Sequence, residues 1–181
     1  MHAPNRDAED LWAEIEKLHE QNFAWALVCC KRNRQEAEDV LQTTYLKVLD
    51  GRARFSAEGR LKTWLFAVIR RTAAGRRRQR VVREGLLNVV GLFRRSGVAD
   101  SNPEGEALDS QRGRLLRRRL AGLSLRQRQV LELVFYQDLS IEQAASVLGV
   151  TLGTARVHYD RGKKRFAELL ALEEGEHELR A

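Results

Sequence analysis

The stretch SIEQAASVLGVTLGTARVHYDRGKKR, residues 140–165, decides the fold of this chain. Ser140 is suited to cap a helix, and Gln143, three residues later, completes a capping box. Gly149 can adopt the positive φ of a tight turn, and Thr151 can cap the helix that follows. A short helix, a glycine turn and a capped second helix have the spacing of a helix-turn-helix.

The second helix of this motif has an apolar side and a charged side. Leu152, Ala155 and Tyr159 recur at helical spacing, so we expect them to be buried and the rest to face solvent. Arginine can contact guanine through two hydrogen bonds, aspartate can accept one from cytosine, and valine can touch a thymine methyl group. An ordinary helical hairpin with a solvated face is the alternative. The predicted DNA-binding residues are Thr154, Arg156, Val157, Asp160, Arg161 and Lys164.

Composition predicts an all-α protein with no membrane partner. Of the 181 residues, 43% are hydrophobic and 31% are charged, which is typical of a folded globular chain. Only two prolines interrupt it, so long helices are allowed. Its longest apolar run, residues 23–30, is far too short to span a bilayer, and residues 1–10 do not resemble a secretion signal. We therefore expect a cytoplasmic protein.

The positive charge is concentrated in one stretch. The formal net charge is +7, and residues 60–83 contain no acidic side chain. A cluster of this kind attracts polyanions and releases counterions when it binds them, which favours nucleic acid over a merely solvated helix face. The basic residues in the stretch are Arg60, Lys62, Arg70, Arg71, Arg76, Arg77, Arg78, Arg80 and Arg83.

Periodicity divides the chain into two small helical domains. Apolar residues at helical spacing predict a first domain over residues 8–80 and a second over residues 112–172. Between them, residues 81–111 contain recurring glycines and a turn-rich segment, which predicts a flexible linker. Residues 173–181 are predicted to form a solvated acidic tail.

Both domains resemble parts of bacterial sigma factors. LSLRQRQVL at residues 123–131, followed by DLSIEQAASVLGVTLGTARVHYDRGKKRF at residues 138–166, resembles their fourth region. EAEDVLQ at residues 36–42, then Phe55 and RLKTWLFAVIRR at residues 60–71, resembles their second region. The order of the two matches, with no third domain between them, resembles the extracytoplasmic-function (ECF) group of the sigma-70 family.

The predicted helix over residues 36–49 carries a candidate partner surface. Its core-facing residues leave one side free, and Leu46 is apolar on that side although water should cover it. The resemblance implies that this side grips the coiled coil of the β′ subunit of core RNA polymerase. The residues concerned are Asp39, Gln42, Thr43 and Leu46.

The loop over residues 54–59 and the basic helix after it match the part that captures the melted minus-ten strand. Such capture requires a pocket for a flipped base and a cationic track for phosphates. Phe55 and Trp64 could stack on bases, but their spacing favours core packing. The predicted minus-ten residues are Ser56, Ala57, Glu58, Lys62, Arg70, Arg71, Arg76 and Arg77.

Nothing in the sequence predicts an enzyme, a metal site or a cofactor. The four histidines are scattered, and the adjacent Cys29 and Cys30 have no partner at zinc spacing, so we interpret them as small buried side chains. The resemblance implies three partners: core polymerase through the β′ coiled coil and β flap, promoter DNA with its minus-thirty-five and minus-ten elements, and an anti-sigma factor. A stand-alone helix-turn-helix regulator and a helical interaction module remain the alternatives.

Overall fold

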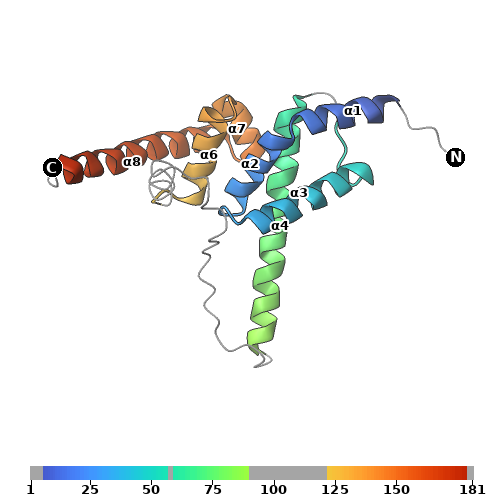
Figure 1. Cartoon of the computed structure of the whole chain (residues 1–181), viewed down its shortest axis with the longest axis horizontal. Helices are drawn as coiled ribbons and strands as arrows, with labels where there is room; N and C mark the ends of the chain where they lie inside the picture. Colours follow the sequence, from blue (N-terminus) through green and yellow to red (C-terminus); the bar gives the residue numbers. More distant parts are fainter. Residues whose placement is uncertain (1–5, 57–58, 90–121, 179–181) are drawn as a thin grey trace. The chain divides into compact units, whose positions relative to one another are not determined.

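The computed structural model describes residues 6–56, 59–89 and 122–178, and every regular element in those ranges is an α-helix (Figure 1). The predicted all-α class is confirmed. The chain divides into two units, residues 1–83 and 84–181. The helices of the first unit are α1 (Arg6–Lys17), α2 (His19–Cys29), α3 (Arg34–Leu49) and α4 (Leu61–Val89, which runs past residue 83). Those of the second are α6 (Leu125–Phe135), α7 (Ile141–Leu148) and α8 (Leu152–Glu178).

The core of the first unit forms around a fully buried tryptophan. The Trp25 indole on α2 lies 5.8 Å from the Phe66 ring on α4 and donates a hydrogen bond of 3.0 Å to the Phe66 carbonyl. This bond satisfies the one polar group of the indole, so the ring can be buried without the cost of an unpaired donor. Leu65 and Ile69 add apolar area from α4, and Val40 adds it from α3.

Helix α3 begins and ends where local chemistry requires it. The Asn33 side chain accepts a hydrogen bond of 2.8 Å from the Glu36 backbone N–H and thereby caps the helix. At the other end Gly51 has φ +71°, a conformation that side chains with a Cβ rarely adopt. Gly51 therefore lies directly after the C-terminal cap of α3.

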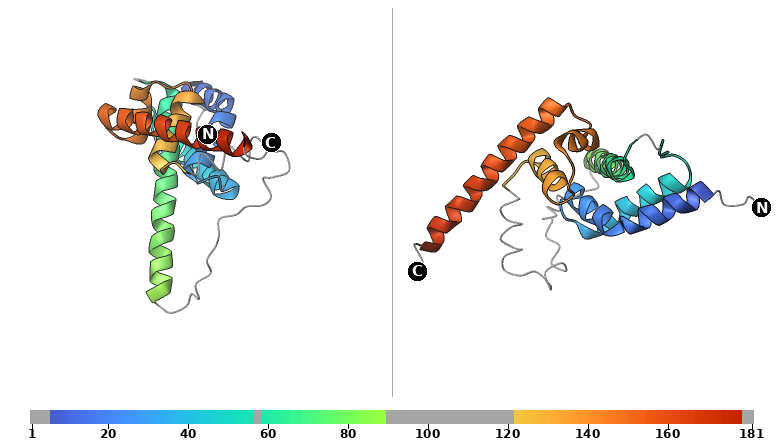
Figure 2. Two further views of the ribbon diagram at one scale, coloured as in Figure 1. Left: turned by 90° about the vertical axis from the view of Figure 1, so that its left-hand side faces the viewer. Right: turned by 90° about the horizontal axis from the view of Figure 1, so that it is seen from above.

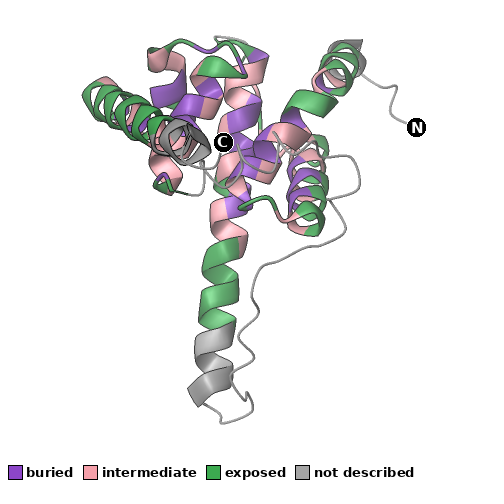
Figure 3. Cartoon of the chain, turned by 60° about the vertical axis from the view of Figure 1, so that its left-hand side comes forward, coloured by how far each residue is buried: buried purple, intermediate pink, exposed green. Residues whose placement is uncertain are grey.

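Helix α4 is longer than the sequence pattern predicts. Its last residue is Val89, so the start of the expected linker at residues 81–111 is helical and the expected end near residue 80 is wrong. The physical reason is that the arginines after residue 75 are good helix formers, and a single glycine such as Gly85 does not stop a helix. Figure 3 shows α4 passing from buried to exposed along its length. The described side chains of residues 77–83 are all exposed.

The second unit contains the helix-turn-helix. Ser140 and Gln143 form the predicted capping box, with hydrogen bonds of 2.9 and 3.1 Å, and Gly149 adopts φ +57°. The Thr151 hydroxyl accepts a hydrogen bond of 3.2 Å from the Thr154 backbone N–H at the start of α8. A second capping box, at Ser124, begins α6. The caps at Ser124, Ser140 and Thr151 fix where α6, α7 and α8 begin, and Gly149 fixes where α7 ends.

A close contact between helices completes this unit. A Cβ added at Gly162 of α8 would come within 3.2 Å of Leu131 on α6, so the absence of a side chain lets the two helices approach. Figure 2 shows α8 continuing past the part that α6 and α7 cover. The helix reaches Glu178, so residues 173–178 are helical where a solvated tail is expected.

The described residues contain neither a candidate membrane-spanning helix nor a candidate metal-binding cluster. None of the helices in this part of the chain combines the length and apolar character needed to cross a bilayer. No group of three or more histidine, cysteine, aspartate or glutamate side chains within the described ranges could hold a metal ion.

Candidate nucleic-acid interface

The predicted recognition surface lies on the first turns of α8. Ala155 is buried and Tyr159 is half-buried, so the opposite side of the helix faces solvent. The Tyr159 ring stacks at 5.8 Å on Phe135 of α6, which fixes the rotation of α8 about its axis. Val157 is 46% exposed, an unusual fraction for a β-branched apolar side chain. Exposed together with Val157 are the other predicted residues, Thr154, Arg156, Asp160, Arg161 and Lys164.

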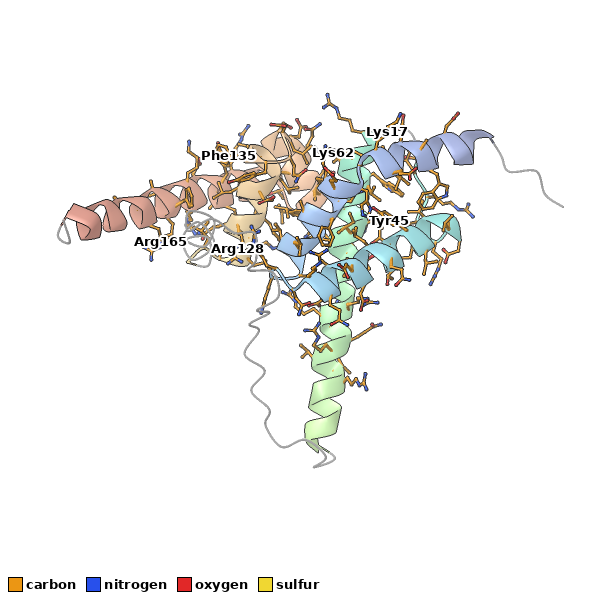
Figure 4. The ribbon with its side chains drawn as sticks, viewed as in Figure 1. Lys17, Tyr45, Lys62, Arg128, Phe135 and Arg165 are labelled. Carbon is orange, nitrogen blue, oxygen red and sulfur yellow. The ribbon has the colours of Figure 1, made fainter. Side chains whose placement is uncertain are left out.

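Two aromatic side chains at the end of α6 are exposed, which the apolar pattern of the sequence does not indicate. Phe135 is 55% exposed although it stacks on Tyr159, and Tyr136 is 62% exposed. Figure 4 shows Phe135 projecting from α6. The periodicity of residues 130–135 predicts burial, and Leu133 is buried, but Phe135 is the last residue of the helix and lies outside the core.

The basic side chains of α4 lie in different surroundings. Arg71 and Arg77 are exposed and form no ion pair with another described residue. Arg70 and Lys62 are half-buried, and the Lys62 ammonium lies 5.6 Å from the centre of the Phe66 ring. Arg76 is held by α3. These five residues were predicted together as minus-ten DNA-binding residues, and their surroundings in the structure differ.

Arg76 and Arg80 form ion pairs with α3. Arg76 Nη1 lies 2.7 Å from Asp39 Oδ2, and Arg80 Nη2 lies 2.6 Å from Glu36 Oε1. The stretch over residues 60–83 contains no acid, but two acids from another helix partly neutralise it. The positive charge of residues 60–83 is therefore partly neutralised, although the stretch itself contains no acid. The sequence of the stretch does not show this, because the acidic partners belong to a different helix.

The candidate polymerase-binding side of α3 is exposed over much of its length. Asp39, Gln42 and Leu46 are exposed, and Thr43 is half-buried. Leu46 is 51% exposed and Leu49, one turn later, is 61% exposed. Leu49 therefore adds a second exposed apolar side chain to this end of the helix.

The predicted base pocket is only partly described. Ser56 is exposed, whereas Ala57 and Glu58 lie outside the described residues. Phe55 and Trp64 are half-buried, with ring centres 5.3 Å apart and planes tilted by 49°. They pack against each other rather than inside the core.

A polar cluster supports α3 from its other side. The Tyr45 hydroxyl accepts a hydrogen bond of 3.2 Å from the Asn22 amide and lies 3.2 Å from His19 Nδ1. The Trp12 ring meets Tyr45 edge-on at 6.0 Å, so the tyrosine lies between α3 and the first two helices (Figure 4). Burial raises the pKa of Tyr45, and the Asn22 hydrogen bond opposes that effect in part. The phenol therefore stays neutral and holds three helices together.

Family models match both units. A model of sigma-70 region 2 matches residues 15–82, and a model of sigma-70 region 4 matches residues 113–166. The second match covers the helix-turn-helix, and the first covers α2, α3 and α4 up to residue 82.

Individual proteins show the same relationship. The ECF RNA polymerase sigma factor SigL of Mycobacterium tuberculosis is 32% identical over 127 residues, which are 68% of this chain and 70% of that protein. The ECF sigma factor SigE of Mycolicibacterium smegmatis is 28% identical over 88% of this chain, and the match spans 62% of SigE.

A solved structure agrees with the sequence matches. The sigma factor RpoE of Bartonella quintana, crystallised in complex with the anti-sigma factor NepR, superposes with a TM-score of 0.68 and 28% identity. The superposition covers 90% of this chain and 98% of that one. Sigma factors are transcription initiation factors that bind core RNA polymerase and promoter DNA. With two matching regions in the same order and relatives of the same kind, the chain belongs to the ECF group of the sigma-70 family.

Proposed function

We propose that the chain directs promoter-specific initiation by reading the minus-thirty-five element with α8 and capturing the melted minus-ten strand with α4 and the loop before it. The observation that carries this proposal is the exposed, chemically mixed side of α8, whose rotation Tyr159 and Phe135 fix. A recognition helix needs both an outward donor and acceptor pattern and a rigid setting.

The chemistry of α8 supports direct readout of base edges. Arg156 and Arg161 can each donate two hydrogen bonds to one guanine, and Asp160 can accept one from cytosine. A surface that bound phosphates alone would need no acid and no exposed valine, whereas this one has Asp160 and Val157. The mixture favours sequence reading over backbone attraction alone.

The exposed arginines of α4 support the minus-ten part of the proposal. Arg71 and Arg77 are available to phosphates, and capture of single strands relies on such cations. Ser56, at the end of the described loop, could contact a flipped base. Arg76 differs from these residues because Asp39 and Thr43 of α3 already bind its guanidinium.

The polymerase is proposed to bind the exposed side of α3 through its β′ coiled coil, and the second unit through its β flap. Leu46 and Leu49 offer apolar area beside the carboxylate of Asp39, a combination suited to a helical partner. Since the similar RpoE was crystallised with an anti-sigma factor, we also propose an anti-sigma partner for this chain. The chain is proposed to perform no catalysis of its own.

Run-off transcription tests the proposal directly. Core RNA polymerase is incubated with promoter templates, with and without the purified chain, and transcripts of defined length are expected only when the chain is present. A stand-alone helix-turn-helix regulator would instead bind DNA without polymerase and leave initiation by core unchanged. Absence of transcripts on every template, together with failure to bind core, would contradict the proposal.

A further inference from the structure

Helices α3 and α4 are joined by a row of polar contacts. Lys47 Nζ donates to Thr72 Oγ1 at 3.1 Å, and Arg80 pairs with Glu36 at 2.6 Å. Arg76 lies between these two contacts and binds α3 twice. Residues 72, 76 and 80 are spaced by four along α4, and their partners follow in the reverse order along α3, where the two helices cross (Figure 1).

Arg76 makes the central contact of this row. Its Nη1 lies 2.7 Å from Asp39 Oδ2, and its Nη2 donates to Thr43 Oγ1 at 3.1 Å. Asp39 and Thr43 are one helical turn apart, and the planar guanidinium is wide enough to hold both at once. Lysine, with a single ammonium group, would not hold the two in the same way.

The two acceptors of Arg76 belong to the side of α3 that is proposed to bind polymerase. The Asp39 side chain is 51% exposed, so its carboxylate can still accept a hydrogen bond from a partner while Arg76 holds the Oδ2 oxygen. A carboxylate on an exposed helix otherwise samples several rotamers, and fixing one of them lowers the entropy lost on binding.

Arg77, the next residue along α4, has different surroundings from Arg76. Arg77 is turned by about 100° from Arg76 around α4, is exposed, and forms no ion pair with a described residue. A phosphate could reach Arg77 without competing with any described contact, whereas at Arg76 it would compete with the Asp39 carboxylate for the same guanidinium. Adjacent arginines that the sequence groups together therefore have different surroundings.

We propose that Arg76 is a positioning residue of the polymerase-binding surface, which presets Asp39 and Thr43, and that it is not a contact to DNA. This inference rests on the proposed function, in which α3 binds core polymerase. It assigns the phosphate track of α4 to the exposed Arg71 and Arg77 and removes Arg76 from it.

The first test compares affinities for purified core polymerase by titrating the fluorescently labelled full-length chain. Arg76→Ala is expected to weaken binding about three- to tenfold, the range for losing one preset contact of this kind. Arg76→Lys is expected to recover only part of the loss. Arg83→Ala is the matched control, because it removes the same charge from an exposed position on the same helix. Equal affinities of the Arg76→Ala and Arg83→Ala variants would overturn the proposal.

The second test separates positioning from DNA contact. Holoenzyme is formed at saturating concentrations of each variant, and its affinity for a single-stranded minus-ten oligonucleotide is measured. Arg77→Ala is expected to weaken strand binding, whereas Arg76→Ala is expected to match Arg83→Ala. Loss of strand affinity in Arg76→Ala with unchanged affinity for core would make Arg76 a DNA contact and overturn the proposal.

The third test separates positioning from a purely structural role. The charge swap Asp39→Arg with Arg76→Asp restores an ion pair between the helices but moves the carboxylate from α3 to α4. The thermal midpoint is expected to return to the wild-type value, while affinity for core stays low. Recovery of both would show that the ion pair only stabilises the fold. If the unmodified chain does not bind core at all, it is the proposed function that fails.

Discussion

Arg161 and Lys164 lie on the same exposed side of α8 but differ in the chemistry that they offer. Arg161 can form two hydrogen bonds with one guanine, whereas Lys164 provides a single mobile charge suited to phosphate. Arg161→Ala is expected to cost about 1–3 kcal/mol at one base position of the minus-thirty-five element. The measurement is holoenzyme affinity for a set of single-base promoter variants, with Lys164→Ala as the comparison. A uniform loss across the set would make Arg161 a phosphate contact.

Cys30 is expected to be chemically inert in the folded protein. Burial, aided by the nearby Glu36, raises the pKa of the Cys30 thiol from 9.0 to about 12. A pKa raised in the folded state adds stability that is fully present below pH 9 and is lost as the pH rises toward 12. At pH 8 in a Cys29→Ser background, iodoacetamide is expected to label Cys30 only after unfolding.

The control for Cys30 is its neighbour. Cys29 is half-buried, so in a Cys30→Ser background it should react faster with iodoacetamide than Cys30 does. Equal labelling rates of the two thiols in the native chain would contradict the burial of Cys30.

At the scale of the helix, Gly162 determines how closely α8 approaches α6. A Cβ at this position would meet Leu131 at 3.2 Å and Gln127 at 3.3 Å, so a branched side chain has no room. Gly162→Val is expected to lower the free energy of unfolding by about 1–3 kcal/mol, the usual cost of overpacking. Denaturant unfolding of the full-length chain, followed by circular dichroism, measures the change.

Gly75 of α4 supplies the matched control for this substitution. A Cβ at Gly75 meets nothing within 4 Å, so Gly75→Val is expected to change the free energy of unfolding by less than about 0.5 kcal/mol. If Gly162→Val and Gly75→Val change the free energy of unfolding equally, then the α6–α8 contact is looser than the distances indicate.

Individual helices could be predicted from the sequence only as far as local chemistry fixes them. The cap at Ser140 and the turn at Gly149 depend on a few neighbouring residues, and both are confirmed. The predicted end of α4 was wrong, because arginines that form helix well continue beyond the last core residue. The apolar pattern is lost there, but the helix continues. Amphipathic periodicity reports burial, and a helix that leaves the core no longer shows it.

At the level of the complete chain, both units are proposed to act on polymerase and DNA. Leu46→Asp places a charge in the apolar part of the α3 surface, where the side chain is 51% exposed, and is expected to abolish core binding without unfolding the chain. Val82→Asp, at a position 61% exposed on α4, is the control for adding a charge to an exposed apolar site. The measurement is core affinity alongside far-ultraviolet circular dichroism. Unchanged affinity in Leu46→Asp would remove α3 from the polymerase interface.

The all-α class, the helix-turn-helix and the likeness to sigma factors could be predicted from the sequence alone. Caps, glycine turns and apolar spacing depend on residues that are close along the chain. The surroundings of each basic side chain, in contrast, depend on how the helices pack and became visible only in the tertiary structure. Arg76 and Arg77 are neighbours in sequence, but one meets Asp39 from a helix 37 positions away and the other meets solvent. Charges pair through space, so their partners are set by how helices pack and not by their order along the chain.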